Sequence, residues 1–290
     1  MTIEVLEPHG FCAGVQNALQ KALALVSSTQ TPPNPNTPQP KHPPTQTPIY
    51  CLHELVHNQL VVSRLKERGM VFVDSPAEVP VGATLLFSAH GVNPAVRRAA
   101  AERGLRVVDA TCPFVARVHA AARDFAARGL RVVVIGRPDH AEVQGIVGEV
   151  EDPLVISGPD DLPAVAAAGT RPLGVVSQTT LNSDDVAAVV ERLRVRFTIE
   201  TTAEVCQATK VRQDAVRAFR GDALLVLGSA NSSNTKRLCE VARCRTFRAG
   251  TLDEVKALDF SGVETLGVTS GASTPEEFFK AVVRELEERE

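Results

Sequence analysis

The sequence predicts an α/β fold with mainly parallel sheets, and three observations lead to this prediction. Short β-rich runs alternate with helical runs along nearly the whole chain, as in proteins built from βαβ units. Several of the β-rich runs are continuously apolar, as expected for strands that are covered on both faces. Similar blocks also recur around three cysteines, which indicates three α/β modules packed around a common centre.

The elements follow from these patterns in chain order. The opening MTIEVLEPHG is typical of a strand followed by a turn. Runs of apolar and β-branched residues predict further strands at Ile49–Leu52, Leu85–Phe87, Val107–Asp109, Val132–Ile135, Leu173–Val176, Leu224–Leu227 and Thr265–Val268. The runs between them predict helices at Gly14–Val26, Leu60–Arg68, Pro94–Arg103, Pro113–Arg128, Ser183–Arg196, Ala208–Arg220, Thr235–Ala242 and Pro275–Glu288.

One stretch, Ser27–Pro48, interrupts the alternation. Proline fills 8 of its 22 positions, and the others are Ser, Thr, Gln, Asn, Lys and His. Without an aliphatic or aromatic side chain to bury, such a segment cannot offset the entropy of folding. We therefore expect a flexible, partly polyproline-like insert, with a docking segment as the alternative.

Composition and charge narrow the class of protein. The chain has 290 residues, of which 44% are hydrophobic and 22% charged, values that are ordinary for a soluble enzyme. A net charge of −3 gives no sign of a nucleic-acid surface. The sequence contains no apolar run that could span a bilayer and does not begin like a secretory signal. We expect a cytoplasmic protein whose six cysteines form no disulfide framework.

Three cysteines open the similar blocks: Cys12 in EPHGFCAGV, Cys112 in VVDATCPFV and Cys206 in AEVCQATKVRQ. Each follows a strand-like stretch and precedes a helix-like one. The absence of a CxxC pair speaks against a zinc knuckle or a thioredoxin-type pair. Three converging thiolates could instead bind a four-iron cluster and leave one iron open to a substrate. Burial in the core is the alternative, and it is our interpretation of Cys51, Cys239 and Cys244.

Polar turns follow the predicted strands of each block, and they should face one cavity, because ligand sites lie beyond the carboxyl ends of parallel strands. Three of these turns contain His57, His90 and His140. Turns at helix starts offer N–H groups and a partial positive charge, which suit a phosphate. Two further turns supply side chains that are either helix caps or phosphate ligands: Ser232, Ser233, Asn234 and Ser273.

Glu142 lies two residues after His140. It is either part of a surface ion pair or a proton donor held near a reaction centre. Thr179 and Thr180, in SQTTL, are either helix caps or a hydroxyl relay for a proton. The chain has neither a Walker A loop nor a GxGxxG after a strand. A redox enzyme built in this way would therefore take its electrons from another protein.

Nine motifs follow one another along the chain: GFCAGV, HELVHN, FSAHGV, DATCP, the HAE turn, SQTTL, ATKVRQ, ANSSNT and TSGAS. In these motifs and their order, the chain resembles the IspH (LytB) family of 4-hydroxy-3-methylbut-2-enyl diphosphate reductases from Ile3 to its last helix. Two positions depart from the family pattern. The common HPE is His140-Ala141-Glu142 here, and His9 replaces a frequent arginine before GFC.

The resemblance implies a trefoil of three similar α/β modules with mainly parallel sheets around a central cluster cavity. The first module would span residues 14–112 with a disordered insert at 27–48, the second 113–204, and the third 1–13 together with 205–290. A 4Fe-4S cluster would be bound by Cys12, Cys112 and Cys206. The substrate diphosphate would be held by His57, His90, His140, Ser232, Ser233, Asn234 and Ser273. Glu142 would be the proton source, working with Thr179.

The implied reaction is the last step of the non-mevalonate isoprenoid pathway. Two electrons, from an external donor such as ferredoxin or flavodoxin, and two protons remove the substrate hydroxyl as water, giving isopentenyl and dimethylallyl diphosphates. Because allylic hydroxide is a poor leaving group, both a Lewis-acidic iron and a proton from Glu142 should assist its loss. The alternatives are a non-catalytic iron–sulfur sensor of the same fold, a zinc-bound structural module and a zinc hydrolase.

Overall fold

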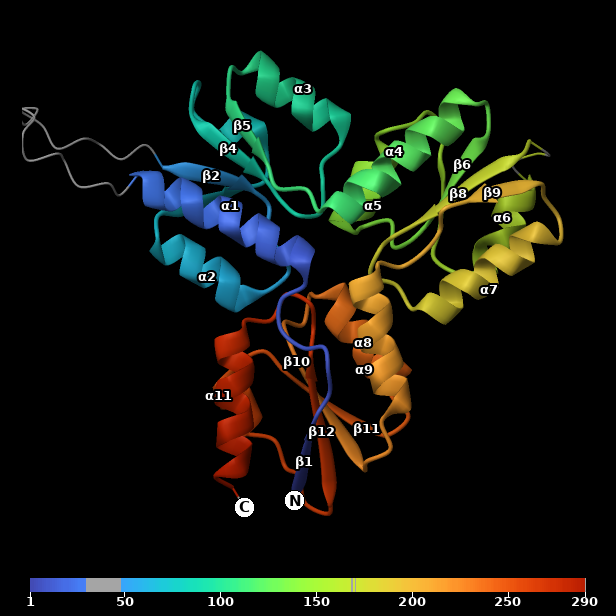
Figure 1. The fold of residues 1–290 in the computed structure, drawn as a ribbon. Coiled ribbons are helices and arrows are strands. Elements are labelled where there is room, and N and C mark those ends of the chain that lie inside the picture. The colour runs from blue at the N-terminus through green and yellow to red at the C-terminus, as the bar shows by residue number, and fades with distance from the viewer. Residues whose placement is uncertain (30–47, 168, 170, 290) are drawn as a thin grey trace, which may run out of the picture.

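Three four-stranded parallel sheets radiate from a common centre in the computed structural model, which describes residues 1–29, 48–167, 169 and 171–289 (Figure 1). The first has the order β3 (Met70–Val73), β2 (Ile49–Leu52), β4 (Thr84–Phe87), β5 (Arg106–Asp109). The second has the order β7 (Leu154–Ile156), β6 (Arg131–Ile135), β8 (Leu173–Ser177), β9 (Ile199–Thr201). The third has the order β1 (Thr2–Val5), β12 (Thr265–Ser270), β10 (Ala223–Leu227), β11 (Arg245–Ala249). This arrangement confirms the predicted parallel trefoil.

Helices cover both faces of each sheet. The first sheet is flanked by α1 (Ala13–Thr29), α2 (Gln59–Glu67) and α3 (Pro94–Glu102). The second carries α4 (Pro113–Ala127), α5 (Ala141–Val147), α6 (Leu162–Ala167) and α7 (Ser183–Arg194). The third carries α8 (Gln207–Ala218), α9 (Ser233–Val241), α10 (Leu252–Lys256) and α11 (Glu276–Glu287). Two short 3₁₀ helices, η1 (Pro76–Glu78) and η2 (Pro159–Asp161), lie in loops.

Each sheet is packed between two separate apolar cores, one on each face. In β4, for example, Leu86 packs into the core beneath α1 and α2, whereas its neighbour Leu85 packs into the core beneath α3. Successive side chains of a strand point to opposite faces, so a strand in the middle of such a sheet is apolar at every position. This is why the central strands appear in the sequence as continuous apolar runs.

The structure adds four strands to those predicted, namely β3, β7, β9 and β11. All four lie at the edges of their sheets. Their residues are less completely buried than those of the central strands, as in β11, where only Ala249 of its five residues is buried. Edge strands have one unpaired side and less cover, which explains the polar residues of β9 and β11. Strands β3 and β7 are apolar throughout, so this reason does not apply to them.

The start of the proline-rich stretch differs from the prediction. Helix α1 continues through Ser27 and Ser28 to Thr29, three residues beyond the predicted end at Val26. The remainder of the predicted insert, residues 30–47, lies outside the described residues. Strand β1 pairs with β12, which joins the N-terminal strand to the third sheet. Module boundaries at residues 13, 112 and 204 stay a prediction.

The parallel strands carry their following turns to the centre of the molecule. The turns after nine strands, all except β3, β7 and β11, contribute residues to one central cavity. The sequence predicts this convergence, and the structure confirms it. None of the helices in the described parts of the chain is long and apolar enough to cross a membrane.

Candidate active site at the centre of the trefoil

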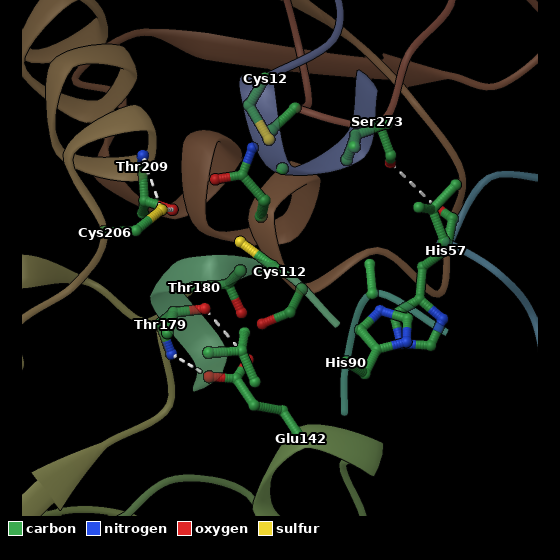
Figure 2. A pocket seen from close by; sticks show the side chains of 18 of the residues that line it. Cys12, His57, His90, Cys112, Glu142, Thr179, Thr180, Cys206, Thr209 and Ser273 are labelled. Carbon is green, nitrogen blue, oxygen red and sulfur yellow. Dashed lines mark hydrogen bonds between the residues drawn. The ribbon is translucent and has the colours of Figure 1, made fainter. Parts of the chain in front are cut away.

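The central cavity has a volume of about 110 Å³ and is lined by all three modules (Figure 2). Its walls contain all twelve residues to which the sequence and the family resemblance assign a role: Cys12, His57, His90, Cys112, His140, Glu142, Thr179, Cys206, Ser232, Ser233, Asn234 and Ser273. Figure 2 shows the three thiols gathered toward one side and His57 and His90 on the other.

The three thiols line one cavity because each stands where a chain segment enters a helix. Cys12 directly precedes α1, and Cys112 and Cys206 are the N-cap residues of α4 and α8. A Cβ atom placed on Gly14 would lie 2.6 Å from Sγ of Cys112 and 3.9 Å from Sγ of Cys12. The glycine therefore leaves open the space between two sulfurs, and a larger residue would fill it.

The charge of Glu142 acts on the Cys112 and Cys206 thiols. Burial raises the pKa of the Cys112 and Cys206 thiols, and the charges of Cys12 and Glu142 raise both further. Opposing contributions come from hydrogen bonds, such as that from the Thr209 backbone N–H to Sγ of Cys206, at 3.4 Å. The partial positive charge at three helix starts also favours thiolates. A metal that binds here must displace the proton of each thiol, so its binding should release protons.

The other cysteines lie away from this cavity. Cys51 is fully buried in the core beneath α1, and burial raises the pKa of its thiol to about 12. Cys239 and Cys244 pack, partly buried, against the core formed with α8 and α9. These positions agree with their interpretation as core residues.

Glu142 is buried beside the thiols, with an exposed fraction of 1%. Its Oε1 accepts a hydrogen bond from the backbone N–H of Thr179 at 2.7 Å, and its Oε2 accepts one from the Thr179 hydroxyl at 3.1 Å. Burial raises the pKa of the carboxyl to about 7, although both hydrogen bonds oppose the rise. The group can therefore hold or release a proton at neutral pH.

The three predicted histidines form one cluster. The rings of His57 and His90 stack with centroids 4.2 Å apart, and the His140 ring stands edge-on to them at 5.4 Å and 5.9 Å. Burial and the neighbouring histidines lower the pKa of His140 to about 4 and that of His90 well below its usual value. Nδ1 of His140 accepts the backbone N–H of Glu142 at 3.2 Å. The neutral ring then carries its proton on Nε2, where it can donate to a ligand.

The third module contributes the start of α9. Ser232 caps this helix by accepting the backbone N–H of Thr235 at 3.3 Å. The first turn of α9 holds Asn234, which is 5% exposed and whose side-chain oxygen and nitrogen both lack a hydrogen-bond partner. Buried polar atoms without partners are rare in proteins and indicate a missing ligand or water. Ser273 also faces the cavity, and its hydroxyl donates to the carbonyl of His57 at 3.1 Å.

Two residues that connect the modules were not predicted. Glu54, in the HELVHN motif, accepts hydrogen bonds from Gln59 at 2.7 Å and Asn231 at 2.8 Å, and its Oε2 lies 3.1 Å from Nδ1 of His57. Gln178, in SQTTL, donates to the Ser233 hydroxyl at 3.1 Å. Both lie in motifs that the sequence singles out, but the contacts from Glu54 to Asn231 and from Gln178 to Ser233 cross between modules.

Comparison with known proteins agrees with this geometry. The profile of the LytB protein family matches residues 3–287. Among curated proteins, the 4-hydroxy-3-methylbut-2-enyl diphosphate reductase of Methylococcus capsulatus is 39% identical over 99% of this chain and 91% of its own length. The enzyme of the same name from Rhodococcus opacus is 41% identical over 97% of this chain and 82% of its own length.

Two solved structures also resemble the chain. One is the E-1-hydroxy-2-methyl-but-2-enyl-4-diphosphate reductase of Plasmodium falciparum, with 29% identity, a TM-score of 0.86, and coverage of 98% of this chain and 87% of that one. Another, described as the terminal enzyme of the non-mevalonate pathway, has 29% identity, a TM-score of 0.67, and coverage of 99% and 100%. The chain therefore belongs to the LytB protein family.

Proposed function

We propose that this protein is a 4-hydroxy-3-methylbut-2-enyl diphosphate reductase, as its relatives are named, and that it converts this substrate to isopentenyl and dimethylallyl diphosphates. The allylic C–O bond breaks, a C–H bond forms, and the hydroxyl leaves as water, with two electrons and two protons consumed. The observation that carries the proposal is the position of Glu142, a carboxyl with a pKa of about 7, in the same cavity as three thiols.

A 4Fe-4S cluster fits the thiol side of the cavity, with Cys12, Cys112 and Cys206 as its ligands. Among the described residues, no three His, Cys, Asp or Glu side chains converge tightly enough to hold a single metal ion. In a cluster, each of the three thiolates binds a different iron, so their sulfurs need not meet at one point. A single zinc ion needs all of its ligands within bonding distance of one point, so the three thiolates suit a cluster better. When bound, the cluster supplies single electrons and a Lewis-acidic iron for the substrate hydroxyl.

The residues of the chain hold the substrate and move the proton. His90 and His140 are neutral at pH 7, and their ring N–H groups can donate to the diphosphate together with Ser232, Ser233, Ser273 and the amide of Asn234. The start of α9 adds backbone N–H groups and a partial positive charge. At the other end of the substrate, Glu142 would give a proton to the departing hydroxyl, with Thr179 fixing the position of the carboxyl.

The electrons would come from an external protein such as ferredoxin or flavodoxin, because the sequence has no dinucleotide fingerprint. We also expect a cytoplasmic enzyme that binds neither nucleic acid nor membrane.

Anaerobic purification followed by iron analysis tests the function. We expect a brown, oxygen-sensitive protein with about four irons per chain that consumes the hydroxylated diphosphate when a low-potential donor is supplied. A protein that stays colourless and iron-free after anaerobic reconstitution would overturn the proposal. A protein that binds iron and forms no product would instead support the sensor alternative.

A further inference from the structure

Arg212 is a buried cation close to the thiols, and it has no part in the proposed reaction. It lies on α8, six residues after Cys206, and is 3% exposed. Its Nη1 donates to the carbonyl of Ala208 at 2.9 Å, and its Nη2 donates to the carbonyls of Gly10 at 2.9 Å and His9 at 3.4 Å. Its Nε is buried and has no acceptor. All of these acceptors are neutral.

Such burial is costly unless a negative charge compensates for it. Arg217, five residues further along the same helix, has such compensation, because its guanidinium forms ion pairs with Asp184 at 3.0 Å and Asp214 at 3.2 Å. In the described parts of the chain, no carboxylate forms an ion pair with Arg212. The negative charge that the guanidinium requires must therefore come from another kind of group.

The source of this negative charge follows from the groups that stabilise the ionised guanidinium of Arg212. Burial lowers the pKa of Arg212, and the opposing contributions come from Cys12, Cys206 and Glu7, in that order. The side chain of Glu7 is 73% exposed, and one of its oxygens lies 3.1 Å from Nε2 of His9. Solvent therefore screens Glu7, and the two cavity thiols, which are partly buried, are the remaining partners.

The hydrogen bonds of Arg212 also tie together the two segments that carry these thiols. The carbonyl of Gly10 belongs to the loop two residues before Cys12, and Ala208 stands two residues after Cys206. Gly10 has a φ of 69°, which favours glycine, and its N–H donates to the hydroxyl of Ser270 at 2.8 Å. One planar guanidinium thus joins the Cys12 loop to the helix that begins at Cys206.

We propose that Arg212 is the fixed counter-charge of the three-thiolate site, and that it also holds the Cys12 loop against α8. The inference rests on the proposed function, because it requires the thiolates to bind a cluster. Each electron that a cluster accepts adds negative charge, and a cation fixed nearby in a region of low dielectric constant stabilises that charge. Arg212 therefore raises the reduction potential of the cluster and slows the loss of its iron.

The test measures the reduction potential of the reconstituted cluster by a spectroscopic redox titration, and the release of iron to a chelator. Arg212→Gln removes the charge, and we expect the equilibrium constant for one-electron reduction to fall at least tenfold, which corresponds to about 59 mV. Arg212→Lys keeps the charge, so its potential stays close to that of the wild type. It should release iron faster, because an ammonium group lacks the planar fork that joins the carbonyls.

Lys210→Gln is the matched control. Lys210 lies on the same helix, but its side chain is half-exposed and pairs with Asp214 at 2.7 Å. Removal of this charge should leave the potential and the iron release unchanged. If Lys210→Gln lowers the reduction potential as much as Arg212→Gln does, the change in net charge of the protein explains the effect, and the role assigned to Arg212 is wrong.

The remaining outcomes separate this inference from the proposed function. A wild-type chain that binds no iron contradicts the function itself. A wild-type cluster with the potential and iron release unchanged in Arg212→Gln contradicts only the role of Arg212. If circular dichroism shows that Arg212→Gln does not fold without iron, the Arg212→Lys variant is used to test the proposal instead. Its potential must stay near the wild-type value, and a failure of this variant to fold as well would show that Arg212 serves the fold and would overturn the proposal.

Discussion

Thr179 holds the carboxylate of Glu142 with two donors, its backbone N–H at 2.7 Å and its hydroxyl at 3.1 Å. The two residues follow neighbouring strands, β6 and β8, of the second module. Hydrogen bonds of this kind favour the ionised carboxylate, whereas burial favours the neutral acid. Burial has the larger effect, because the pKa of Glu142 rises from 4.5 to about 7. The pair thus combines a fixed position with a proton available at neutral pH.

Glu142→Gln should keep the cluster and lose most turnover. The amide has nearly the same shape and can still accept the Thr179 N–H, but it cannot give a proton. Loss of a general acid lowers kcat about 10²–10⁴-fold. Steady-state kinetics on protein with a matched iron content measures the loss. Glu151→Gln, on the exposed surface after α5, is the control, and a Glu142→Gln variant as fast as this control would exclude the proton-donor role.

Thr179→Val should move the pH profile of kcat to higher pH. The Thr179 hydroxyl lowers the pKa of Glu142, so its removal raises that pKa above about 7. An enzyme that requires protonated Glu142 loses activity as the pH rises through this pKa. The alkaline limb should therefore shift upward in Thr179→Val and stay in place in Thr179→Ser, which keeps the hydroxyl. A shift to lower pH would mean that Glu142 acts in its ionised form.

The sequence predicts those parts of the fold that have a local or periodic signal. The central strands are apolar on both faces and therefore stand out, as the pair Leu85 and Leu86 shows. The edge strand β11 was missed because its half-exposed residues resemble a loop. Helix α5 was also missed, because seven residues carry too little periodicity to be recognised.

The composition of the cavity was predictable, and the contacts within it were only partly so. The order of strands and turns brings Cys12, Cys112 and Cys206 to one place, and the structure confirms that they line one cavity. The partners of Gln178 and Arg212 depend on how segments far apart in the chain pack against each other. The bond from Gln178 to Ser233 spans 55 residues, and the bond from Arg212 to Gly10 spans 202. No local pattern encodes such pairs.

Diphosphate binding should take up protons near pH 6.5. Burial and mutual repulsion hold the pKa of His140 at about 4 and that of His90 well below its usual value, so both rings are neutral before binding. A bound polyanion raises both pKa values, and binding should become tighter as the pH falls from about 8 to 6. Titration calorimetry with inorganic pyrophosphate, in two buffers of different ionisation enthalpy, measures the uptake.

His140→Asn is the informative variant for this histidine prediction. Asparagine is a good N-cap residue, so it can replace Nδ1 of His140 as acceptor for the Glu142 N–H and keep the start of α5. It cannot take up a proton. We expect weaker pyrophosphate binding with less proton uptake and an unchanged thermal melting curve. Proton uptake equal to that of the wild type would show that other groups accept the protons.

Gly14→Ala should separate the stability of the chain from its ability to hold a cluster. Gly14 lies within α1, where alanine is favoured over glycine by up to about 1 kcal/mol. The new Cβ would stand 2.6 Å from Sγ of Cys112, so this thiol must move from its position in the cavity. The iron-free chain should melt close to the wild-type temperature, while iron content after anaerobic reconstitution falls sharply. Gly158→Ala, where a Cβ meets no atom within 4 Å, should bind iron normally. If Gly14→Ala binds a full complement of iron, Cys112 is not a required ligand in the position that the structure gives it.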